Sequence, residues 1–321
     1  MTSQKPAVGV LSIGDMGAGF AGLLVAHGFN VVTNVSDRSK ATQERAAAAH
    51  VQFVSSDVEL CDICEVILSI VPPKDALSTA ERIAAAATDP SALTPMKAIR
   101  FLDLNAVSPE SSRQIDVLFS QRAPQVRFLD GCIIGSPPKL LPDGTWTRPN
   151  IVLSGPHRLD QVEAHGQYLA STLKVKHQSN EIGSASGLKM CFASMTKGLT
   201  ALAIQSFTTA HQLGVVEELQ EQLKEMAPKL NESVNRSLPS MPPKAYRWVR
   251  EMEEIASTFE ANGGFTTDES IFRAIAKTYA LVSDETELGK EQTDARVRGL
   301  TSEDVACLMA EGTSSRISKL D

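Results

Sequence analysis

Six consecutive residues near the start of the chain have the types and spacing to hold phosphates: Ser12, Ile13, Gly14, Asp15, Met16 and Gly17. An apolar run over 8–11 precedes them, and a helical pattern follows at once. The spacing is that of the G-x-G-x-x-G turn of dinucleotide-binding units, with serine in the first glycine position. In such a turn the backbone N–H groups and the positive end of the helix bind a pyrophosphate. The sequence therefore predicts a nucleotide cofactor bound through these residues.

A second polar segment follows the next predicted strand, which covers residues 30–35. At this place NAD-binding proteins usually have a carboxylate, whereas NADP-binding proteins have an arginine beside the 2′-phosphate of the ribose. Arg38, between Ser36 and Ser39, suits a 2′-phosphate through charge-assisted hydrogen bonds. Asp37 suits a free 2′-hydroxyl instead. The segment favours NADP(H) over NAD(H); NAD binding through Asp37, or a merely solvated loop, are the alternatives.

The candidate for proton transfer is Lys189. A nicotinamide cofactor supplies the hydride, and the protein must supply an acid or base at the reacting atoms. None of the six histidines falls in a motif that places it there. Lys189 stands one turn into a helix predicted to begin near Gly183, where burial between domains would lower its pKa. We expect Lys189 to be the general acid in reduction and the general base in oxidation; the alternative is a lysine whose stem covers an apolar stripe.

These residues need a scaffold, and the chain up to about residue 180 predicts one by alternating strands with helices. Continuous apolar runs predict strands buried on both faces, over residues 66–71, 99–105, 126–134 and 151–153. This alternation predicts an α/β fold with a Rossmann-type, doubly wound parallel sheet, and with ligands at the carboxyl ends of its strands. Val71, Pro72 and Asn105 lie at the carboxyl ends of two of these strands and are expected near the nicotinamide. For each of them, ordinary turn chemistry is the alternative.

After residue 180 the pattern is helical throughout. A helix of about thirty residues ends near Gly214, with an apolar stripe of Leu188, Phe192, Met195, Leu199 and Leu202. Such a helix usually bridges domains or packs against a partner subunit, and it favours a homodimer. We therefore expect a dinucleotide-binding domain over 1–180 and an all-α substrate and dimerisation domain over 181–321. A later helix that carries Trp248 is expected to cover the cleft, with ordinary helix packing as the alternative.

Composition argues against nucleic-acid-binding, membrane-spanning and secreted proteins. The 321 residues carry a net charge of −7 with a pI near 5.5, which argues against a nucleic-acid or anionic-membrane surface. No apolar stretch approaches the roughly 20 residues that span a bilayer, and the first strand begins too early for a signal peptide. Five cysteines indicate free thiols in a reducing compartment, with Cys61 and Cys64 as buried thiols because no second ligand pair is spaced for a metal. We expect a cytoplasmic protein without a metal that acts on a small molecule.

Four segments, spread over both predicted domains, match one known family. They are residues 12–17, Val71-Pro72, Phe128-Leu129-Asp130-Gly131-Cys132-Ile133-Ile134-Gly135-Ser136, and Gly183-Ser184-Ala185-Ser186-Gly187-Leu188-Lys189. The third is similar to the substrate loop F-L-D-A-P-V-S-G-G, and the fourth to the start of an interdomain helix with a catalytic lysine. The chain thereby resembles the 6-phosphogluconate dehydrogenase / β-hydroxyacid dehydrogenase superfamily, in particular NAD(P)-dependent oxidoreductases with a small helical C-terminal domain. The resemblance implies a nicotinamide cofactor and a catalytic role for Lys189.

The chain also departs from that family's pattern. Ile134 replaces the serine that helps to bind the substrate carboxylate in the acid dehydrogenases, and Phe192 and Ala193 replace two asparagines beyond the lysine. The loop after Ser136 is apolar, with Pro137, Pro138, Leu140, Leu141 and Trp146. These changes argue against a small, highly charged sugar acid and favour a larger, less polar carbonyl compound or an imine. The expected substrate contacts are Ile134, Gly135, Ser136 and Trp248.

Together these observations predict an NADP(H)-dependent oxidoreductase that transfers a hydride between the nicotinamide and a carbonyl or hydroxyl carbon. An imine reductase or reductive aminase on the same scaffold is the first alternative, although related enzymes often have Asp or Tyr where this chain has Lys189. A non-catalytic NADP-binding sensor is the second.

Overall fold

The structure, a computed structural model, describes residues 7–34, 40–94, 97–163, 165–291 and 296–317. The chain forms two compact units, Met1–Lys189 and Met190–Asp321. The division falls inside a long helix, α7 (Ser184–Leu213), and so lies later than residue 180, where the sequence pattern changes.

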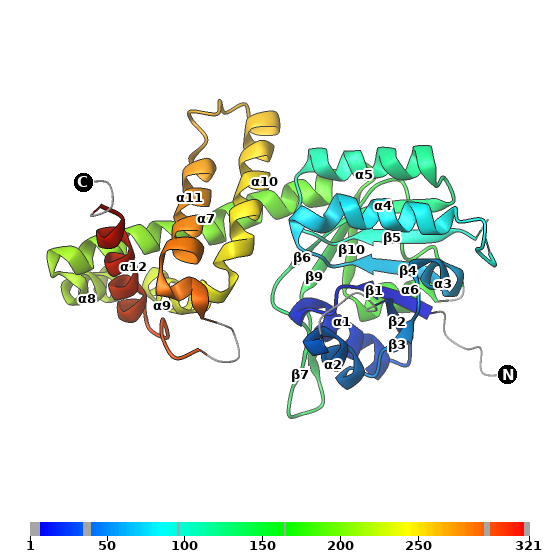
Figure 1. The fold of residues 1–321 in the computed structure, drawn as a ribbon, viewed down its shortest axis with the longest axis horizontal. Coiled ribbons are helices and arrows are strands. Elements are labelled where there is room, and N and C mark those ends of the chain that lie inside the picture. Colours follow the sequence, from blue (N-terminus) through cyan, green and yellow to red (C-terminus); the bar gives the residue numbers. More distant parts are fainter. Residues whose placement is uncertain (1–6, 35–39, 95–96, 164, 292–295, 318–321) are drawn as a thin grey trace. The chain divides into compact units, whose positions relative to one another are not determined.

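The first unit is built on an eight-stranded sheet with the order β10-β9-β6-β5-β4-β1-β2-β3 (Figure 1). Its strands are β1 (Ala7–Leu11), β2 (Asn30–Asn34), β3 (Gln52–Val54), β4 (Cys64–Ser69), β5 (Ile99–Asp103), β6 (Val126–Ile134), β9 (Asn150–Ser154) and β10 (Val175–Ser179). All pairs from β3 through β2, β1, β4 and β5 to β6 are parallel. The predicted α/β class with a doubly wound sheet is confirmed.

The last two strands differ from the expected parallel sheet. β9 pairs antiparallel with β6, with Cys132 opposite Val152, and β10 pairs parallel with β9. A short hairpin, β7 (Lys139–Leu140) and β8 (Trp146–Thr147), joins β6 to β9 in place of a crossover helix. Because a parallel return needs such a crossover, the chain comes back antiparallel. The polar edge strand β10 was not predicted, since it has no apolar run.

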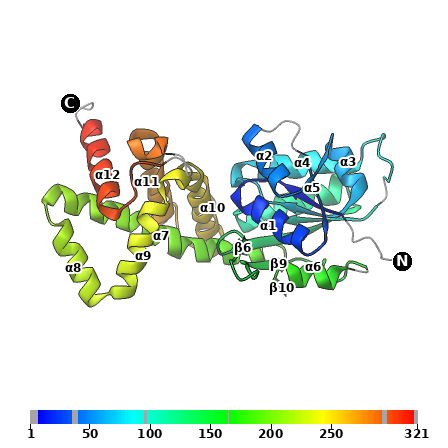
Figure 2. The ribbon, with the colours of Figure 1, turned by 90° about the horizontal axis from the view of Figure 1, so that it is seen from below.

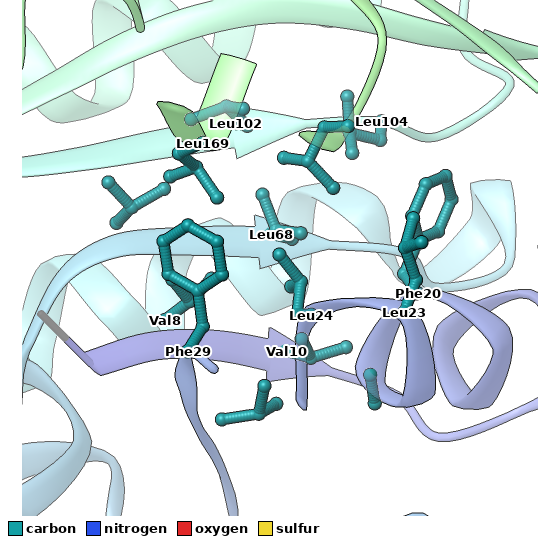
Figure 3. Packing of buried hydrophobic residues seen from close by; sticks show 14 of the residues in the cluster. Val8, Val10, Phe20, Leu23, Leu24, Phe29, Leu68, Leu102, Leu104 and Leu169 are labelled. Atoms are coloured by element: carbon teal, nitrogen blue, oxygen red, sulfur yellow. The ribbon is translucent and has the colours of Figure 1, made fainter. Parts of the chain in front are cut away.

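Helices cover both faces of the sheet. α1 (Asp15–Ala26) and α6 (Gly166–Thr172) share one apolar cluster with β1, whose members include Phe20, Leu24, Leu169, Val8 and Val10 (Figure 3). α2 (Lys40–Ala48) adds Ala46 to this cluster. On the other face lie α3 (Asp57–Ile63), α4 (Ala76–Ala87) and α5 (Pro109–Arg122). Burial on both faces explains why the central strands read as continuous apolar runs.

The second unit is helical (Figure 2). α7 continues into it and is followed by α8 (Val216–Met226), α9 (Pro228–Ser240), α10 (Ala245–Gly263), α11 (Ile271–Glu285) and α12 (Ser302–Ile317). α10 and α11 pack through Phe259 and Phe272, whose ring centroids are 4.7 Å apart. Among the helices of the described ranges, none has the length and apolar character needed to cross a membrane.

Candidate functional site

The predicted phosphate-binding turn lies where the strand order of the sheet reverses. β1 has β2 on one side and β4 on the other. The chain first proceeds from β1 through β2 to β3 at one edge, and then continues from β4 through β5 to β6 on the opposite side of β1. The N–H of Ile70, after β4, donates to the carbonyl oxygen of Leu11 at 3.2 Å and so joins the two carboxyl ends. Open α/β sheets bind ligands at this reversal, outside the carboxyl ends of the strands.

Two glycines shape the turn in different ways. A Cβ on Gly17 would lie 2.0 Å from the carbonyl oxygen of Ser12, so only glycine fits there. Gly14 is the N-cap of α1, no side chain caps the helix at that point, and a Cβ on Gly14 would have no heavy atom within 4 Å. The first turn of a helix also has N–H groups without intrahelical partners. Gly17 allows the helix to pack closely against the turn, and Gly14 leaves open space at the helix start. This combination fits the binding of a dinucleotide pyrophosphate.

Ser12 occupies the position where the fingerprint has glycine, and its φ is +73°, in the left-handed region that glycine favours. We expect Ser12→Gly to raise the free energy of unfolding by up to about 1 kcal/mol through relief of this strain. Urea unfolding of the two proteins measures the difference. An unchanged or lower free energy would mean that the flexibility of glycine in the unfolded chain outweighs the strain.

Of the other residues predicted to bind the cofactor, the structure describes some and not others. Ser36, Arg38 and Ser39, with Asp37, lie outside the described residues, so their contact with the adenosine ribose stays a prediction. Asp15 is exposed in the first turn of α1, and Met16 packs against the core.

Sequence reasoning missed Arg45, which contacts the phosphate-binding turn. This residue of α2 donates from Nε to the carbonyl oxygen of Ile13 at 3.1 Å. No local motif marks it, because the contact spans two elements that meet only in the folded unit.

The carboxyl ends of β4 and β5 are joined by Asn105, which is buried. Its Oδ1 accepts from the N–H of Val71 at 2.7 Å, and its Nδ2 donates to Ser69 Oγ at 3.1 Å and to the carboxylate of Asp103. The structure thus brings Val71 and Asn105 together, with Pro72 at the start of the following 3-10 turn, Pro73–Asp75. Their contact with a nicotinamide stays a prediction.

Lys189 lies in the second turn of α7, close to the end of β6. Its Nζ donates to the carbonyl oxygen of Ile133 at 2.7 Å. Burial lowers the pKa of this ammonium, and the nearby Cys132 thiol opposes the shift only in part. Burial also raises the pKa of Cys132 to about 11, so the thiol is neutral at physiological pH. A lysine with a lowered pKa is suited to give and take a proton.

The predicted substrate residues of the loop motif lie at the end of β6. Ile134 pairs with Asn150 of β9, Gly135 has a φ of +134°, and Ser136 is exposed. Ile134 also borders a cavity of about 810 Å³ formed with residues of β9, α6 and β10. The residues that line this cavity include none from the phosphate-binding turn.

The apolar loop after Ser136 needs a correction. A Cβ on Gly19 would lie 2.8 Å from the carbonyl oxygen of Pro138, and one on Gly22 would lie 3.4 Å from the Trp146 ring. Pro138 and Trp146 therefore pack on α1, and their apolar character serves the fold. The apolar composition of this loop is therefore weaker support for an apolar substrate than the sequence analysis assumed.

Trp248 belongs to the second unit, where it packs among other side chains. Its ring meets Tyr279 edge-on at 5.2 Å, and Lys197 Nζ lies 4.9 Å from the ring centroid. Lys197 is paired in turn with the buried carboxylate of Glu251. A role of Trp248 in substrate binding stays a prediction.

Two further features concern thiols and metals. Cys61 and Cys64 are free and buried at the junction of α3 and β4, and burial raises the pKa of each to about 12. Within the described ranges no group of three or more His, Cys, Asp or Glu residues is arranged to hold a metal ion.

Asp130, named above only as part of the loop motif, is the second residue whose contacts were not predicted. Its carboxylate lies inside the sheet and accepts hydrogen bonds from the start of α7. The signal was present, since an acid in the middle of an apolar, doubly buried strand must find buried donors.

Comparisons with known proteins agree with this geometry. Residues 7–93 match the family described as NADP oxidoreductase coenzyme F420-dependent, and residues 210–282 match a domain of unknown function, DUF1932. The solved structure of the conserved protein MTH1747, of unknown function and described as similar to 3-hydroxyacid dehydrogenases, is 26% identical with a TM-score of 0.58. That match covers 87% of this chain and 97% of MTH1747. The chain has the 3-hydroxyacid dehydrogenase-like fold.

Other solved structures share this fold at lower identity. A 3-hydroxyisobutyrate dehydrogenase from Salmonella typhimurium is 13% identical with a TM-score of 0.59, over 95% of this chain and 99% of its own. An imine reductase from Myxococcus stipitatus in complex with NADP+ is 18% identical with a TM-score of 0.50, over 86% and 93%. An uncharacterized 28.5 kDa protein from Methanothermus fervidus is 26% identical over 197 residues, which are 61% of this chain and 67% of that protein. The resemblance to the β-hydroxyacid dehydrogenase superfamily is thus confirmed for the fold.

Proposed function

We propose that this protein is an NADP(H)-dependent oxidoreductase that interconverts a carbonyl and a hydroxyl group on a small substrate. The observation that carries the proposal is the turn between β1 and α1. It lies at the reversal of the strand order, and its Gly14 leaves open space at an uncapped helix start. The family described as NADP oxidoreductase coenzyme F420-dependent matches residues 7–93, which include this turn.

Lys189 is the proposed acid–base group. When bound, a nicotinamide cofactor supplies or accepts the hydride. In reduction, the Lys189 ammonium gives a proton to the oxygen that becomes the hydroxyl, and the neutral amine remains. In oxidation, the neutral amine takes that proton back. Burial lowers the pKa of Lys189, so its ammonium gives up a proton more readily than that of an ordinary lysine.

Cofactor binding is the first test. We expect NADPH to bind in the micromolar range and NADH at least tenfold more weakly, a difference of about 1.4 kcal/mol, because Arg38 can pair with the 2′-phosphate. Fluorescence titration with NADPH, NADH and coenzyme F420 measures the preference. Tighter NADH binding would assign the ribose to Asp37, and no binding of any of them would refute the oxidoreductase proposal.

An imine reductase is the second candidate function, favoured by the fold shared with an imine reductase that binds NADP+. A panel of carbonyl compounds with and without added amine separates the two reactions. Cofactor consumption without amine supports the carbonyl reaction, whereas consumption only with amine supports the imine reaction. If no compound on the panel consumes a cofactor that binds, and Lys189→Ala leaves cofactor binding and partner association unchanged, the result favours an NADP-binding sensor.

We also propose that the protein is a homodimer. The predicted apolar stripe of α7 is largely exposed, with Met195 75% and Leu202 61% accessible. α8 has one apolar side but no buried residue in the described structure. A second copy that covers this surface would remove it from water.

Light scattering after size exclusion tests the dimer. We expect about twice the 34.5 kDa chain mass for the native protein, and a monomer for Leu202→Glu, because the charge would be buried against the partner. A monomeric native protein at micromolar concentration would contradict the proposal. Lys277→Glu, an exposed charge reversal on α11, serves as the control.

A further inference from the structure

The start of α7 is tied to the sheet through one buried carboxylate, that of Asp130 on β6. Its Oδ2 accepts from the N–H groups of Gly183 at 2.9 Å, Ala185 at 3.1 Å and Ser186 at 3.3 Å. The same oxygen accepts from the hydroxyl of Ser154 at 2.7 Å. Its Oδ1 accepts from the hydroxyls of Ser112, at 2.8 Å, and Ser186.

These donors come from α5, β9 and the first turn of α7, so the carboxylate joins three elements. A buried carboxylate costs several kcal/mol unless its oxygens are fully hydrogen-bonded. The N–H groups at the start of a helix lack intrahelical partners, and the helix dipole favours an anion there. The carboxylate therefore accepts hydrogen bonds from the unpaired N–H groups of the helix start, and these bonds fix the position of the helix start relative to β6.

We propose that Asp130 is a positioning residue that holds Lys189 at the carboxyl end of β6. The inference rests on the proposed acid–base role of Lys189. Asp130 and Ile133 stand three residues apart on β6, while Ser186 and Lys189 stand three residues apart on α7. β6 and α7 are thus joined twice, by the carboxylate at one point and by the hydrogen bond from Lys189 Nζ to the Ile133 carbonyl at the other.

The substitution Asp130→Asn keeps the shape of the side chain and removes its charge. If the carboxylate positions α7, the helix start loosens, water reaches Lys189, and the pKa of Lys189 rises toward the ordinary value of a lysine. Loss of a nearby negative charge without any movement would lower that pKa further. The two explanations therefore predict shifts of opposite sign.

Trace acetylation across a pH series, read by mass spectrometry on the peptide that contains Lys189, measures the titration midpoint. We expect the midpoint in Asp130→Asn to rise by about 1 pH unit. A midpoint that is unchanged or lower would overturn the proposal. Asp57→Asn is the matched control, because Asp57 is also hydrogen-bonded, to Arg82 and Asn34, on elements other than β6 and α7.

Two serine variants keep the test decisive if Asp130→Asn does not fold. Ser112→Ala and Ser154→Ala each remove one hydroxyl donor while the carboxylate keeps its charge. We expect a smaller upward shift of the Lys189 midpoint in both. No shift in either variant would overturn the positioning role.

The labelling needs neither substrate nor cofactor, so it is separate from the test of the proposed function. If Lys189→Met retained full turnover, the acid–base proposal would fail, while an upward shift in Asp130→Asn would still show that Asp130 places the lysine. If Lys189 is essential and its midpoint does not move, the positioning role alone fails.

Discussion

Replacing Lys189 with methionine is expected to lower the turnover number by roughly 10²- to 10⁴-fold, the usual contribution of general acid–base catalysis. Methionine fills the space of the lysine stem but cannot move a proton. NADPH affinity is expected to stay unchanged, since the phosphate-binding turn is formed by other residues. Steady-state kinetics with a substrate from the carbonyl panel, together with the NADPH titration, measure both quantities.

Stability separates this effect from unfolding. The variant loses the hydrogen bond to the Ile133 carbonyl, worth about 1 kcal/mol, and it also loses the cost of burying an ammonium. The free energy of unfolding should therefore change little. Lys277→Met, at an exposed lysine of α11, is the control and should keep full turnover. Equal turnover in the two variants would refute the assignment.

The pH profile should report the same group, because burial lowers the pKa of Lys189. Reduction needs the protonated Nζ, so its rate falls as the pH rises through the lowered pKa, while the oxidation rate rises. In the unfolded chain the lysine has its ordinary, higher pKa. Between the two values the unfolded chain binds more protons, so the contribution of Lys189 to stability rises with pH. An inflection at or above the ordinary lysine value would contradict this account.

Alanine substitutions at Gly17 and at Gly14 are expected to have opposite signatures. Gly17→Ala places a Cβ 2.0 Å from the carbonyl oxygen of Ser12, and we expect it to cost about 3 kcal/mol of stability. Gly14→Ala meets no atom within 4 Å and should cost less than about 1 kcal/mol at this N-cap. The methyl group that Gly14→Ala adds would stand in the open space assigned to the pyrophosphate, so NADPH affinity should fall at least tenfold, about 1.4 kcal/mol.

Urea unfolding and NADPH titration on the same two variants provide the measurement. Gly144→Ala, in the β7–β8 hairpin, adds a Cβ that meets no heavy atom within 4 Å and is a glycine control for stability. It has a φ of +80°, so it should lose some stability and no NADPH affinity. Undiminished NADPH binding by Gly14→Ala would show that the cofactor does not approach the turn at this residue.

The fold could be predicted largely because burial on both faces leaves a strong trace in the sequence. Strands β4, β5 and β6 are largely apolar runs that end at turn residues, and the apolar stripe of α7 predicted a long helix. β10 carries Lys176 and Gln178 on an edge and leaves no such trace. β9 runs antiparallel to β6 because the connection between them is a short hairpin without a helix. The hydrophobic periodicity of the sequence predicts strands but not their direction.

The same distinction applies to the candidate site. The turn with Ser12, Gly14 and Gly17 could be located from the sequence because it is local, and Asn105 could be located because it lies at the end of an expected strand. The contacts of these residues with a cofactor stay predictions. Arg45 and Asp130 act through contacts that span 32 residues or more, to Ile13 and to Gly183, so no local spacing identifies their partners. The apolar loop was misread for a related reason: composition does not say whether Trp146 faces a substrate or a helix.

The bonds around Asp130 also bear on how much of this chain can fold by itself during synthesis. Gly183 follows Asp130 by 53 residues. During synthesis the carboxylate therefore cannot form its hydrogen bonds to the backbone N–H groups until the first turn of α7 has left the ribosome. A fragment that ends at residue 180 contains every strand of the sheet but buries a charge that lacks four of its donors, the three N–H groups and the Ser186 hydroxyl. The first compact unit therefore includes the beginning of the helix that leads away from it.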